Sequence, residues 1–175
     1  MTSDNAAYNV AMCARMDAAE AVKLASRPNV LPYFGMQPTR AHEGDAGYDL
    51  RAAKGHTLPP GQRGLISTDL HVSIPEGYAG LIVPRSGLAL KHGVTVLNAP
   101  GLIDPGYTGE VKALLINHGH ETFLVRPGDR IAQLLLVRAE HPAFTPAPSL
   151  ADLQLLADRE LGARGDGGFG SSGVA

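Results

Sequence analysis

Several features are scarce in this 175-residue chain, and each shortage excludes a class of protein. A single cysteine, Cys13, excludes an intramolecular disulfide framework and fits a reducing cytosol. No apolar run approaches the roughly 18 residues that a membrane-spanning helix needs. The first residues also lack the basic-then-apolar order of a secretory signal. We therefore expect a cytoplasmic protein with no membrane partner.

An excess of charge of one sign is also missing. The chain has 15 Lys and Arg against 17 Asp and Glu, which gives a formal net charge of −2. Such a balance provides no global basic field to attract nucleic acid or an anionic membrane surface. We therefore expect no nucleic-acid partner.

Glycine and proline, in contrast, are abundant, with 21 and 13 residues, and tryptophan is absent. Between residues 28 and 148 they recur every several residues and separate short apolar or alternating runs such as RGLISTDLHVSI, YAGLIVP and RIAQLLLVRAE. Short strands separated by turns are typical of a β-sandwich or barrel. The run EVKALLINH could form a helix, but Gly109 and Gly119 bracket a length typical of a strand. We predict one all-β domain over residues 28–161.

The segments that flank this domain have different compositions. Residues 1–27 include AMCARMDAAEAVKLA, which is rich in helix-forming residues, so this extension is either a short helix or a frayed leader. We expect it to be disordered or partly helical. Near the other end, SLADLQLLADRE has apolar residues close to helical spacing and forms either one or two helical turns or a wrapping segment.

The chain ends in RGDGGFGSSGVA, in which five of twelve residues are glycine. Glycine loses more backbone entropy on ordering than any other residue, so residues 162–175 are predicted to be a flexible arm. The arm carries a cation, Arg164, and one aromatic ring, Phe169.

Two internal segments contain polar residues beside apolar strands. In GDAGYDLRAA, Asp49 lies at a predicted strand start and is either a turn or cap residue or a ligand for metal-bound water or phosphate. In PRSGLALKHG, Arg85, Ser86 and Gly87 offer a guanidinium, a hydroxyl and free backbone, which suit a phosphate if a helical turn begins there. The alternative is that Ser86 is an ordinary N-cap beside a surface arginine.

Two further segments are unusual for ordinary loops. LNAPGLIDPGYTGEVKALLIN predicts a hairpin whose connection is long and rich in turn residues, and there Asp104 and Tyr107 could face one pocket. Alternatively, Asp104 merely begins a DPGY β-turn. In RPGDRIAQLLL, Gln133 interrupts an apolar strand, so its amide either lies on a solvated face or has a specific polar partner.

Together these segments match one family in order and almost residue for residue. The chain resembles the homotrimeric dUTP pyrophosphatases (dUTPases), whose five motifs look like AGYDL, PRSGLA, GLIDPGYTGEVK, RPGDRIAQLLL and RGDGGFGSSG. The resemblance extends over roughly residues 38–173. It implies a distorted jelly-roll, β-barrel-like subunit of a threefold homotrimer. It also implies that a flexible C-terminal arm closes on the active site of a neighbouring subunit.

The resemblance further implies a reaction and the residues that perform it. The family hydrolyses dUTP to dUMP and pyrophosphate by Mg²⁺-assisted attack of water on the α-phosphorus, which limits uracil incorporation into DNA and supplies dUMP for dTMP synthesis. It gives Asp104 the role of general base and places Asp49 near the metal, through water. It assigns substrate binding to Arg85, Ser86, Gly87, Asn98, Gly101, Ile103, Tyr107, Lys112, Gln133, Arg164, Phe169 and Gly170.

Within this set the resemblance implies separate tasks. Asn98 and the adjoining backbone would pair with uracil, and the Tyr107 ring would leave no room for a 2′-hydroxyl. Gln133 would contact the α-phosphate region, Arg164 would reach the γ-phosphate, and Phe169 would stack on the base. Arg85, Ser86 and Gly87 would bind phosphates.

Two other readings compete with this one. A deoxycytidine triphosphate deaminase shares the fold and binds a similar nucleotide, but its pattern does not resemble the GLIDPGYTGE segment followed by the glycine-rich tail. A non-catalytic regulatory protein could be built on the same fold. The intact set of Asp104, Tyr107, Arg85 and Phe169 argues against a loss of catalysis.

Overall fold

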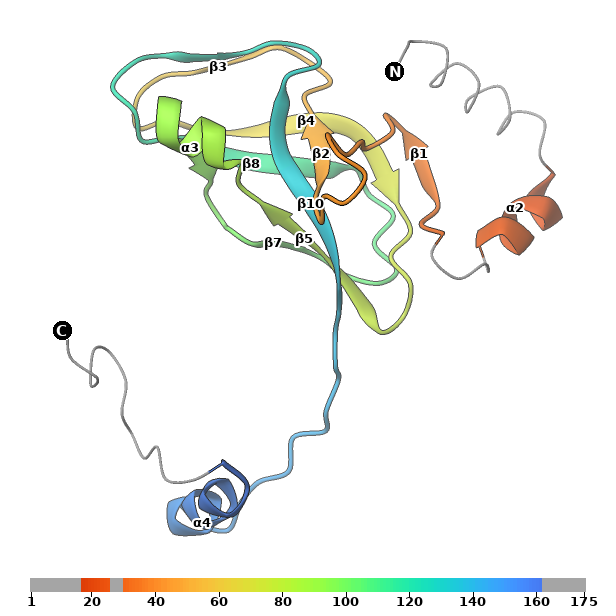
Figure 1. Ribbon diagram of the computed structural model, residues 1–175, viewed down its shortest axis with the longest axis vertical. Coiled ribbons are helices and arrows are strands. Elements are labelled where there is room, and N and C mark those ends of the chain that lie inside the picture. The colour runs from red at the N-terminus through yellow and green to blue at the C-terminus, as the bar shows by residue number, and fades with distance from the viewer. Residues whose placement is uncertain (1–16, 26–29, 162–175) are drawn as a thin grey trace. The chain divides into compact units, whose positions relative to one another are not determined.

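The computed structural model describes residues 17–25 and 30–161, and its elements are mainly strands (Figure 1). The chain divides into two compact units after Glu140. The described elements are α2 (Ala18–Ala25), β1 (Tyr33–Gly35), β2 (Tyr48–Arg51), β3 (His56–Leu58), β4 (Arg63–Val72), β5 (Tyr78–Val83), α3 (Ser86–His92), β6 (Val94–Val96), β7 (Gly101–Ile103), β8 (Val111–Asn117), β9 (Phe123–Val125), β10 (Arg130–Arg138) and α4 (Leu150–Leu161).

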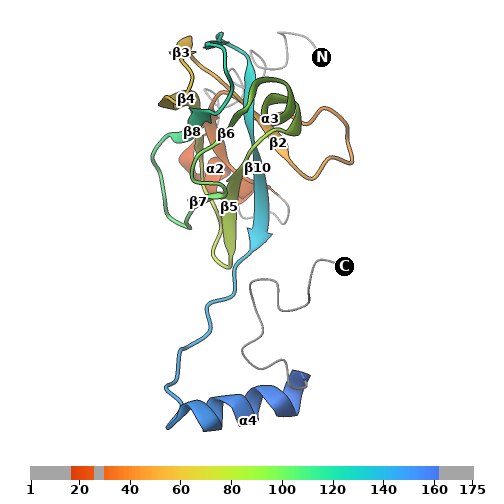
Figure 2. The ribbon, with the colours of Figure 1, turned by 90° about the vertical axis from the view of Figure 1, so that its left-hand side faces the viewer.

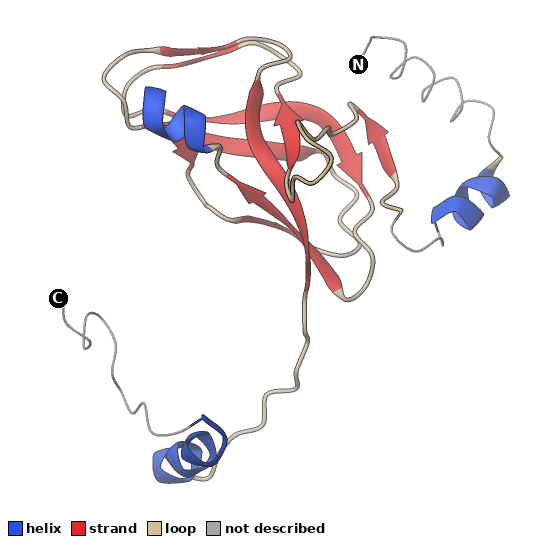
Figure 3. Cartoon of the chain, viewed as in Figure 1, coloured by secondary structure: helices blue, strands red, loops and turns tan. Residues whose placement is uncertain are grey.

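Two four-stranded antiparallel sheets make up the β-domain of the first unit. One sheet has the strand order β1-β4-β8-β6, the other has the order β2-β10-β5-β7, and β3 pairs with β9 in a separate ribbon. Figure 2 shows β10 beside β5 along the length of this domain. Only α3 interrupts the strands between residues 33 and 138 (Figure 3). The predicted all-β class is therefore confirmed.

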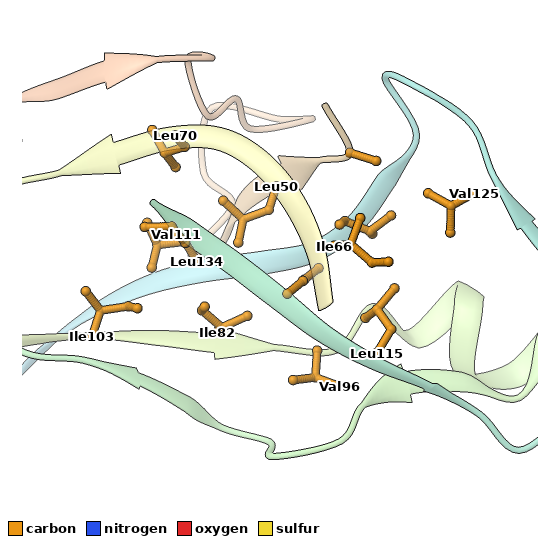
Figure 4. Close-up of a cluster of buried hydrophobic side chains, with 14 of the residues drawn as sticks. Leu50, Ile66, Leu70, Ile82, Val96, Ile103, Val111, Leu115, Val125 and Leu134 are labelled. Atoms are coloured by element: carbon orange, nitrogen blue, oxygen red, sulfur yellow. The ribbon is translucent and has the colours of Figure 1, made fainter. Parts of the chain in front are cut away.

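The core lies between the inner faces of these sheets. Along β4 and β8, buried and more exposed residues alternate, as expected for strands with one face against a core. Ile66, Val111 and Leu115 from one sheet and Leu50 and Ile82 from the other gather in this layer (Figure 4). The run EVKALLINH accordingly forms strand β8, as predicted, and not a helix.

The two helices outside the β-domain both begin with a side-chain cap. Asp17 accepts a hydrogen bond from the Glu20 N–H at the start of α2, and Ser149 accepts one from the Asp152 N–H at the start of α4. Of the two alternatives for SLADLQLLADRE, the helix forms, and with 12 residues it exceeds the predicted one or two turns. No helix within residues 17–25 and 30–161 is long and apolar enough to cross a membrane.

One expectation about strand pairing is wrong. The segment Leu97–Asn117 was expected to form a hairpin, but β7 pairs with β5 in one sheet while β8 pairs with β4 and β6 in the other. The chain therefore crosses between the two sheets at residues 104–110. The predicted arm, with Arg164, Phe169 and Gly170, lies outside the described residues, and the predicted boundaries at 27 and 161 stay predictions.

Candidate active site

Three distant segments meet at one end of the second sheet. Gln133 on the central strand β10 pairs with Asp49 on β2 and with Val83 on β5. Directly opposite residues of antiparallel strands share one face of the sheet, so Gln133 lies beside Asp49. Because β5 ends at Val83, Arg85 follows immediately at the same end.

Asp49 lies inside strand β2, where it is neither a turn residue nor a helix cap. Its side chain is only 5% exposed and lies between two guanidinium groups. Arg85 Nε lies 3.2 Å from Asp49 Oδ1, and Arg130 Nη1 lies 3.3 Å from Oδ2. Arg85 Nη1 also donates to the Arg130 carbonyl oxygen at 2.9 Å. The buried carboxylate thus compensates two cations and fixes the direction of the Arg85 side chain.

The two oxygens of Asp49 differ in their hydrogen bonding. Oδ2 accepts a hydrogen bond from Arg130. Oδ1 is buried and accepts none from the described residues, because the Arg85 N–H, although close, is not aligned with it. Oδ1 therefore keeps its hydrogen-bonding capacity for a water molecule or another donor.

Helix α3 starts directly after Arg85. Arg85 is its N-cap residue, with an extended backbone and no side-chain cap, so the alternative in which Ser86 is the N-cap is wrong. The helix begins one residue earlier than that reading requires, because the Arg85 carbonyl already accepts the N–H groups of Leu88 and Ala89. Ser86 and Gly87 are exposed in the first turn, where backbone N–H groups have no partner within the helix.

The second group of candidate residues lies on the loop that crosses between the sheets. The Tyr107 N–H donates to the Asp104 carbonyl at 3.2 Å and Gly106 has a φ of 80°, so the DPGY turn is present. The Asp104 side chain is exposed in this turn. The Tyr107 hydroxyl donates to the Glu110 carbonyl oxygen at 3.0 Å. The turn therefore holds Asp104 and Tyr107 in one short, bonded loop.

The remaining predicted residues of the described chain lie on β7, on β8 and in the connection before β7. Asn98 is exposed in the connection between β6 and β7. A Cβ atom on Gly101 would come within 3.4 Å of Asn98 Nδ2 and 3.2 Å of the Ile82 Cβ, so glycine leaves room for both side chains. Ile103 is buried in β7, and Lys112 is exposed on β8 opposite Ser67.

Glu110 was missed by the sequence reasoning. Its Oε1 accepts hydrogen bonds from Ser67 Oγ and from the N–H groups of Thr68, at 3.0 Å, and Asp69, at 2.9 Å. The Ser67 bond is the main reason why the pKa of Glu110 falls from 4.5 to about 2; Asp69 and Lys112 lower it further, while burial opposes them. An acid directly before the apolar run VKALLIN was a visible signal, but its partners are more than forty residues away in sequence.

Within one chain the two groups lie on different strands and at different positions along the second sheet. On β5, Val83 pairs with Gln133, whereas Gly80 pairs with Ile103, the residue before Asp104. Three residues along a strand correspond to about 10 Å, and the two strand spacings from β10 to β7 add about 10 Å at right angles. The backbones at Gln133 and Ile103 are therefore separated by about 14 Å.

Carboxylate oxygens are the protein ligands that suit Mg²⁺, and both groups contain one. Within the described ranges, no cluster of three or more His, Cys, Asp or Glu side chains could hold a metal ion directly. Asp49 retains an acceptor at Oδ1, and Asp104 is exposed, so both fit a metal that is held mainly by substrate and water.

Comparison with known proteins places this geometry in one family. The model of the dUTPase family matches residues 35–173. A deoxyuridine 5′-triphosphate nucleotidohydrolase of Mycolicibacterium vanbaalenii is 51% identical over 137 residues, which cover 78% of this chain and 86% of the relative. Its counterpart in Clostridium kluyveri is 41% identical over 153 residues, or 87% of this chain and 96% of the relative.

Solved structures give the same answer. The dUTPase of Staphylococcus bacteriophage 80alpha with dUPNHPP has a TM-score of 0.72 and 30% identity, and the match covers 83% of this chain and 99% of that one. A variant of the dUTPase from phage phi11 of S. aureus, described for its coordination of a structural Mg(II) ion, has a TM-score of 0.65 and 29% identity over 70% of this chain and 99% of that one. The sequence, the jelly-roll architecture and these relatives agree that the chain belongs to the dUTPase family.

Proposed function

We propose that this protein hydrolyses dUTP to dUMP and pyrophosphate, as a dUTP diphosphatase that acts in the cytoplasm. The observation that carries the proposal is the pair of groups described above: a cationic cluster around Asp49 that suits phosphates, and a bonded loop that presents Asp104 and Tyr107. Its product would supply dTMP synthesis, and removal of dUTP would limit uracil incorporation into DNA.

Asp104 would act as the general base. Attack on the α-phosphorus requires a water molecule that is oriented and deprotonated by a carboxylate. The Asp104 side chain is exposed, while its backbone is held by the turn to Tyr107, so the carboxylate is accessible to water and yet fixed in position. The proton of the attacking water passes to Asp104 as the bond between water oxygen and phosphorus forms and pyrophosphate leaves.

Asn98 and Tyr107 would select the nucleoside. The Asn98 amide and the neighbouring backbone would pair with the uracil edge, and cytosine would leave at least one polar group unpaired, at a cost of about 1–3 kcal/mol. Glycine at position 101 leaves room for the Asn98 and Ile82 side chains beside it. The Tyr107 ring would pack against the deoxyribose, where a 2′-hydroxyl has no room.

The cationic cluster would bind the triphosphate. Arg85 would contact phosphate oxygens from a direction set by Asp49, with the N–H groups of Ser86 and Gly87 and the Gln133 amide as further donors. Bound Mg²⁺ would offset the negative charge of the phosphate oxygens. Asp49 would approach that ion through water, since its own charge is already shared by two arginines.

A homotrimer with shared active sites would join the two groups. Within one chain their backbones are about 14 Å apart at Gln133 and Ile103, on different strands of the second sheet. A neighbouring copy would supply the second group, and a third copy would contribute Arg164, Phe169 and Gly170 from its arm. Because ordering an arm costs about 1–2 kcal/mol per residue, it would close only when the nucleotide supplies charge-assisted contacts.

The test is pyrophosphate release from each of the four common dNTPs, from dUTP and from UTP, with and without Mg²⁺. We expect rapid pyrophosphate release from dUTP and from none of the other nucleotides, and a much slower release from dUTP without Mg²⁺. Ammonia release from dCTP, assayed in parallel, would instead identify a deaminase. If no nucleotide yields pyrophosphate while a dUTP analogue still binds, the protein is a non-catalytic member of the fold.

A further inference from the structure

The loop of residues 104–110 is fastened to strand β4, which contributes none of the predicted site residues. In the β4–β8 pairing, Ser67 lies opposite Lys112 and Leu70 lies opposite Val111, so Thr68 and Asp69 form a bulge. Asp69 has a φ of 53°, in the left-handed region that Asp tolerates better than most residues. The bulge turns two backbone N–H groups away from the normal strand pairing.

Glu110 fills this bulge with its carboxylate. One oxygen, Oε1, accepts both released N–H groups, those of Thr68 and Asp69, and also the Ser67 hydroxyl. The Thr68 hydroxyl in turn donates to the Val111 carbonyl oxygen, so the residue after Glu110 is fastened at the same place. The end of the loop is therefore bonded to β4 by both side chain and backbone.

The backbone of Glu110 then positions Tyr107. Its carbonyl oxygen accepts the Tyr107 hydroxyl, and the Tyr107 ring lies over Gly109. A Cβ atom on Gly109 would come within 2.4 Å of the Tyr107 hydroxyl oxygen and 2.6 Å of Cζ. Glycine at this position thus allows the ring to reach the Glu110 carbonyl.

Two further contacts belong to the same arrangement. The Glu110 Oε2 atom lies 3.4 Å from Lys112 Nζ, so the carboxylate also orients a predicted substrate-binding cation. The His71 ring nitrogen Nδ1 bonds to the Thr108 carbonyl oxygen at 2.9 Å and ties the middle of the loop to β4. The His71 contact does not involve Glu110, but all the other contacts of this arrangement except the Thr68 hydroxyl bond do.

We propose that Glu110 is a positioning residue, which clamps the bulge of β4 with its carboxylate and the Tyr107 hydroxyl with its carbonyl, and so fixes the loop that presents Asp104 and Tyr107. This inference rests on the proposed function, in which that loop contacts dUTP. Glu110 itself touches no reacting atom. It acts on the rate through Asp104, and on discrimination between dUTP and UTP through Tyr107.

The experiment compares Glu110→Ala, Glu110→Gln and Gly109→Ala in the full chain. For Glu110→Ala we expect kcat for dUTP to fall more than tenfold and the ratio of kcat/KM for dUTP over UTP to fall at least threefold. Glu110→Gln keeps an oxygen that accepts the two N–H groups, so we expect its kcat for dUTP and its ratio for dUTP over UTP to stay close to those of wild type. Gly109→Ala displaces only the Tyr107 ring, so it lowers the ratio and leaves the thermal midpoint within a few degrees of wild type.

Asn117→Ala is the matched control. Asn117 lies at the opposite end of β8, where its side chain bonds to Leu58, Glu121 and Gly119, so its loss destabilises the same strand away from the loop. We expect a lower thermal midpoint with an unchanged ratio for dUTP over UTP. If Glu110→Ala and Gly109→Ala keep the wild-type ratio and kcat, the positioning role is wrong.

A second measurement does not depend on turnover. NMR spectra are recorded on protein with isotope-labelled tyrosine, and the Tyr107 ring resonance is identified as the one that is missing in Tyr107→Phe. We expect it to shift and broaden in Glu110→Ala, and to stay unchanged in Asn117→Ala. A wild-type protein that does not hydrolyse dUTP would overturn the proposed function, whereas an unmoved Tyr107 resonance in Glu110→Ala would overturn the positioning role alone.

Discussion

Each of the two groups of the candidate site contains a carboxylate that is bonded to its surroundings within the chain, Asp49 in one and Glu110 in the other, and the partners of the two carboxylates differ in kind. Asp49 lies between the guanidinium groups of Arg85 and Arg130. Glu110 is held mainly by neutral donors, namely the Ser67 hydroxyl and two backbone N–H groups, with Lys112 at its other oxygen. Asp49 orients two cationic side chains, whereas Glu110 is bonded mainly to the backbone and a hydroxyl of β4.

This difference suits the two tasks. A guanidinium paired with a carboxylate can exchange part of that contact for a phosphate oxygen, so the Asp49 cluster is able to respond to the charge of a substrate. Within the described residues, the N–H groups of the bulge bond to Glu110 alone, so we expect the Glu110 clamp to stay the same with and without nucleotide. The roles proposed for Asp104 and Tyr107 require that constancy, since a misplacement of about 1 Å costs a large factor in rate.

The largest effect is expected at Asp104, the proposed general base on the loop that Glu110 holds in place. In Asp104→Asn the amide accepts no proton, so we expect turnover of dUTP to fall by about 10²–10⁴-fold, the usual contribution of a general base. Affinity for a non-hydrolysable dUTP analogue, measured by calorimetry, should stay within about tenfold of wild type, because the proposed phosphate contacts lie in the other group. Turnover near the wild-type rate would remove Asp104 from the role of base.

The sequence predicted the strands better than it predicted their partners. Alternation along RGLISTDLHVSI identified β4, and the glycines around EVKALLINH identified β8. The expected hairpin was wrong because Pro100 and Gly101 signal a reversal of the chain without specifying the partner: β7 pairs with β5, which precedes it by about twenty residues. Pairing is decided by tertiary contacts that local turn chemistry does not encode.

The same limit applies to the two carboxylates. Asp49 was singled out because it stands beside an apolar strand, yet its partners Arg85 and Arg130 meet it only through the order of strands in the second sheet. Glu110 was passed over because its role depends on a bulge more than forty residues earlier, and a bulge has no reliable sequence signature. In both cases the sequence shows an acidic residue beside an apolar strand, but it does not show which residues bond to that acid.

A smaller effect is expected from Asp49→Asn, which leaves Arg85 and Arg130 without their anion. Both arginines are partly exposed, 24% and 41%, so water replaces part of the lost interaction and we expect a loss of about 1–2 kcal/mol of stability in the free protein. We expect a dUTP analogue to restore much of that loss, because its phosphates supply the missing negative charge. Thermal unfolding with and without the analogue measures both quantities. The control is Asp45→Asn, which alters a carboxylate four residues away that accepts the His42 N–H; equal recovery in both variants would contradict the charge-exchange role of the Asp49 cluster.

The smallest effect concerns pH, and it distinguishes the Glu110 clamp from the Asp49 cluster. The pKa of Glu110 is lowered from 4.5 to about 2 in the folded protein, so its ionised form stabilises the fold above pH 4.5. As the pH falls from 4.5 towards 2, the unfolded state takes up this proton first, and that stabilisation is lost progressively. The advantage of wild type over Glu110→Gln in urea unfolding should therefore be constant near neutral pH and shrink below pH 4.5. Because the largest cause of the lowered pKa is the hydrogen bond from the neutral Ser67 hydroxyl, added salt should change this advantage little. An advantage that disappears in high salt at neutral pH would mean that the ion pair with Lys112, and not the clamped bulge, dominates.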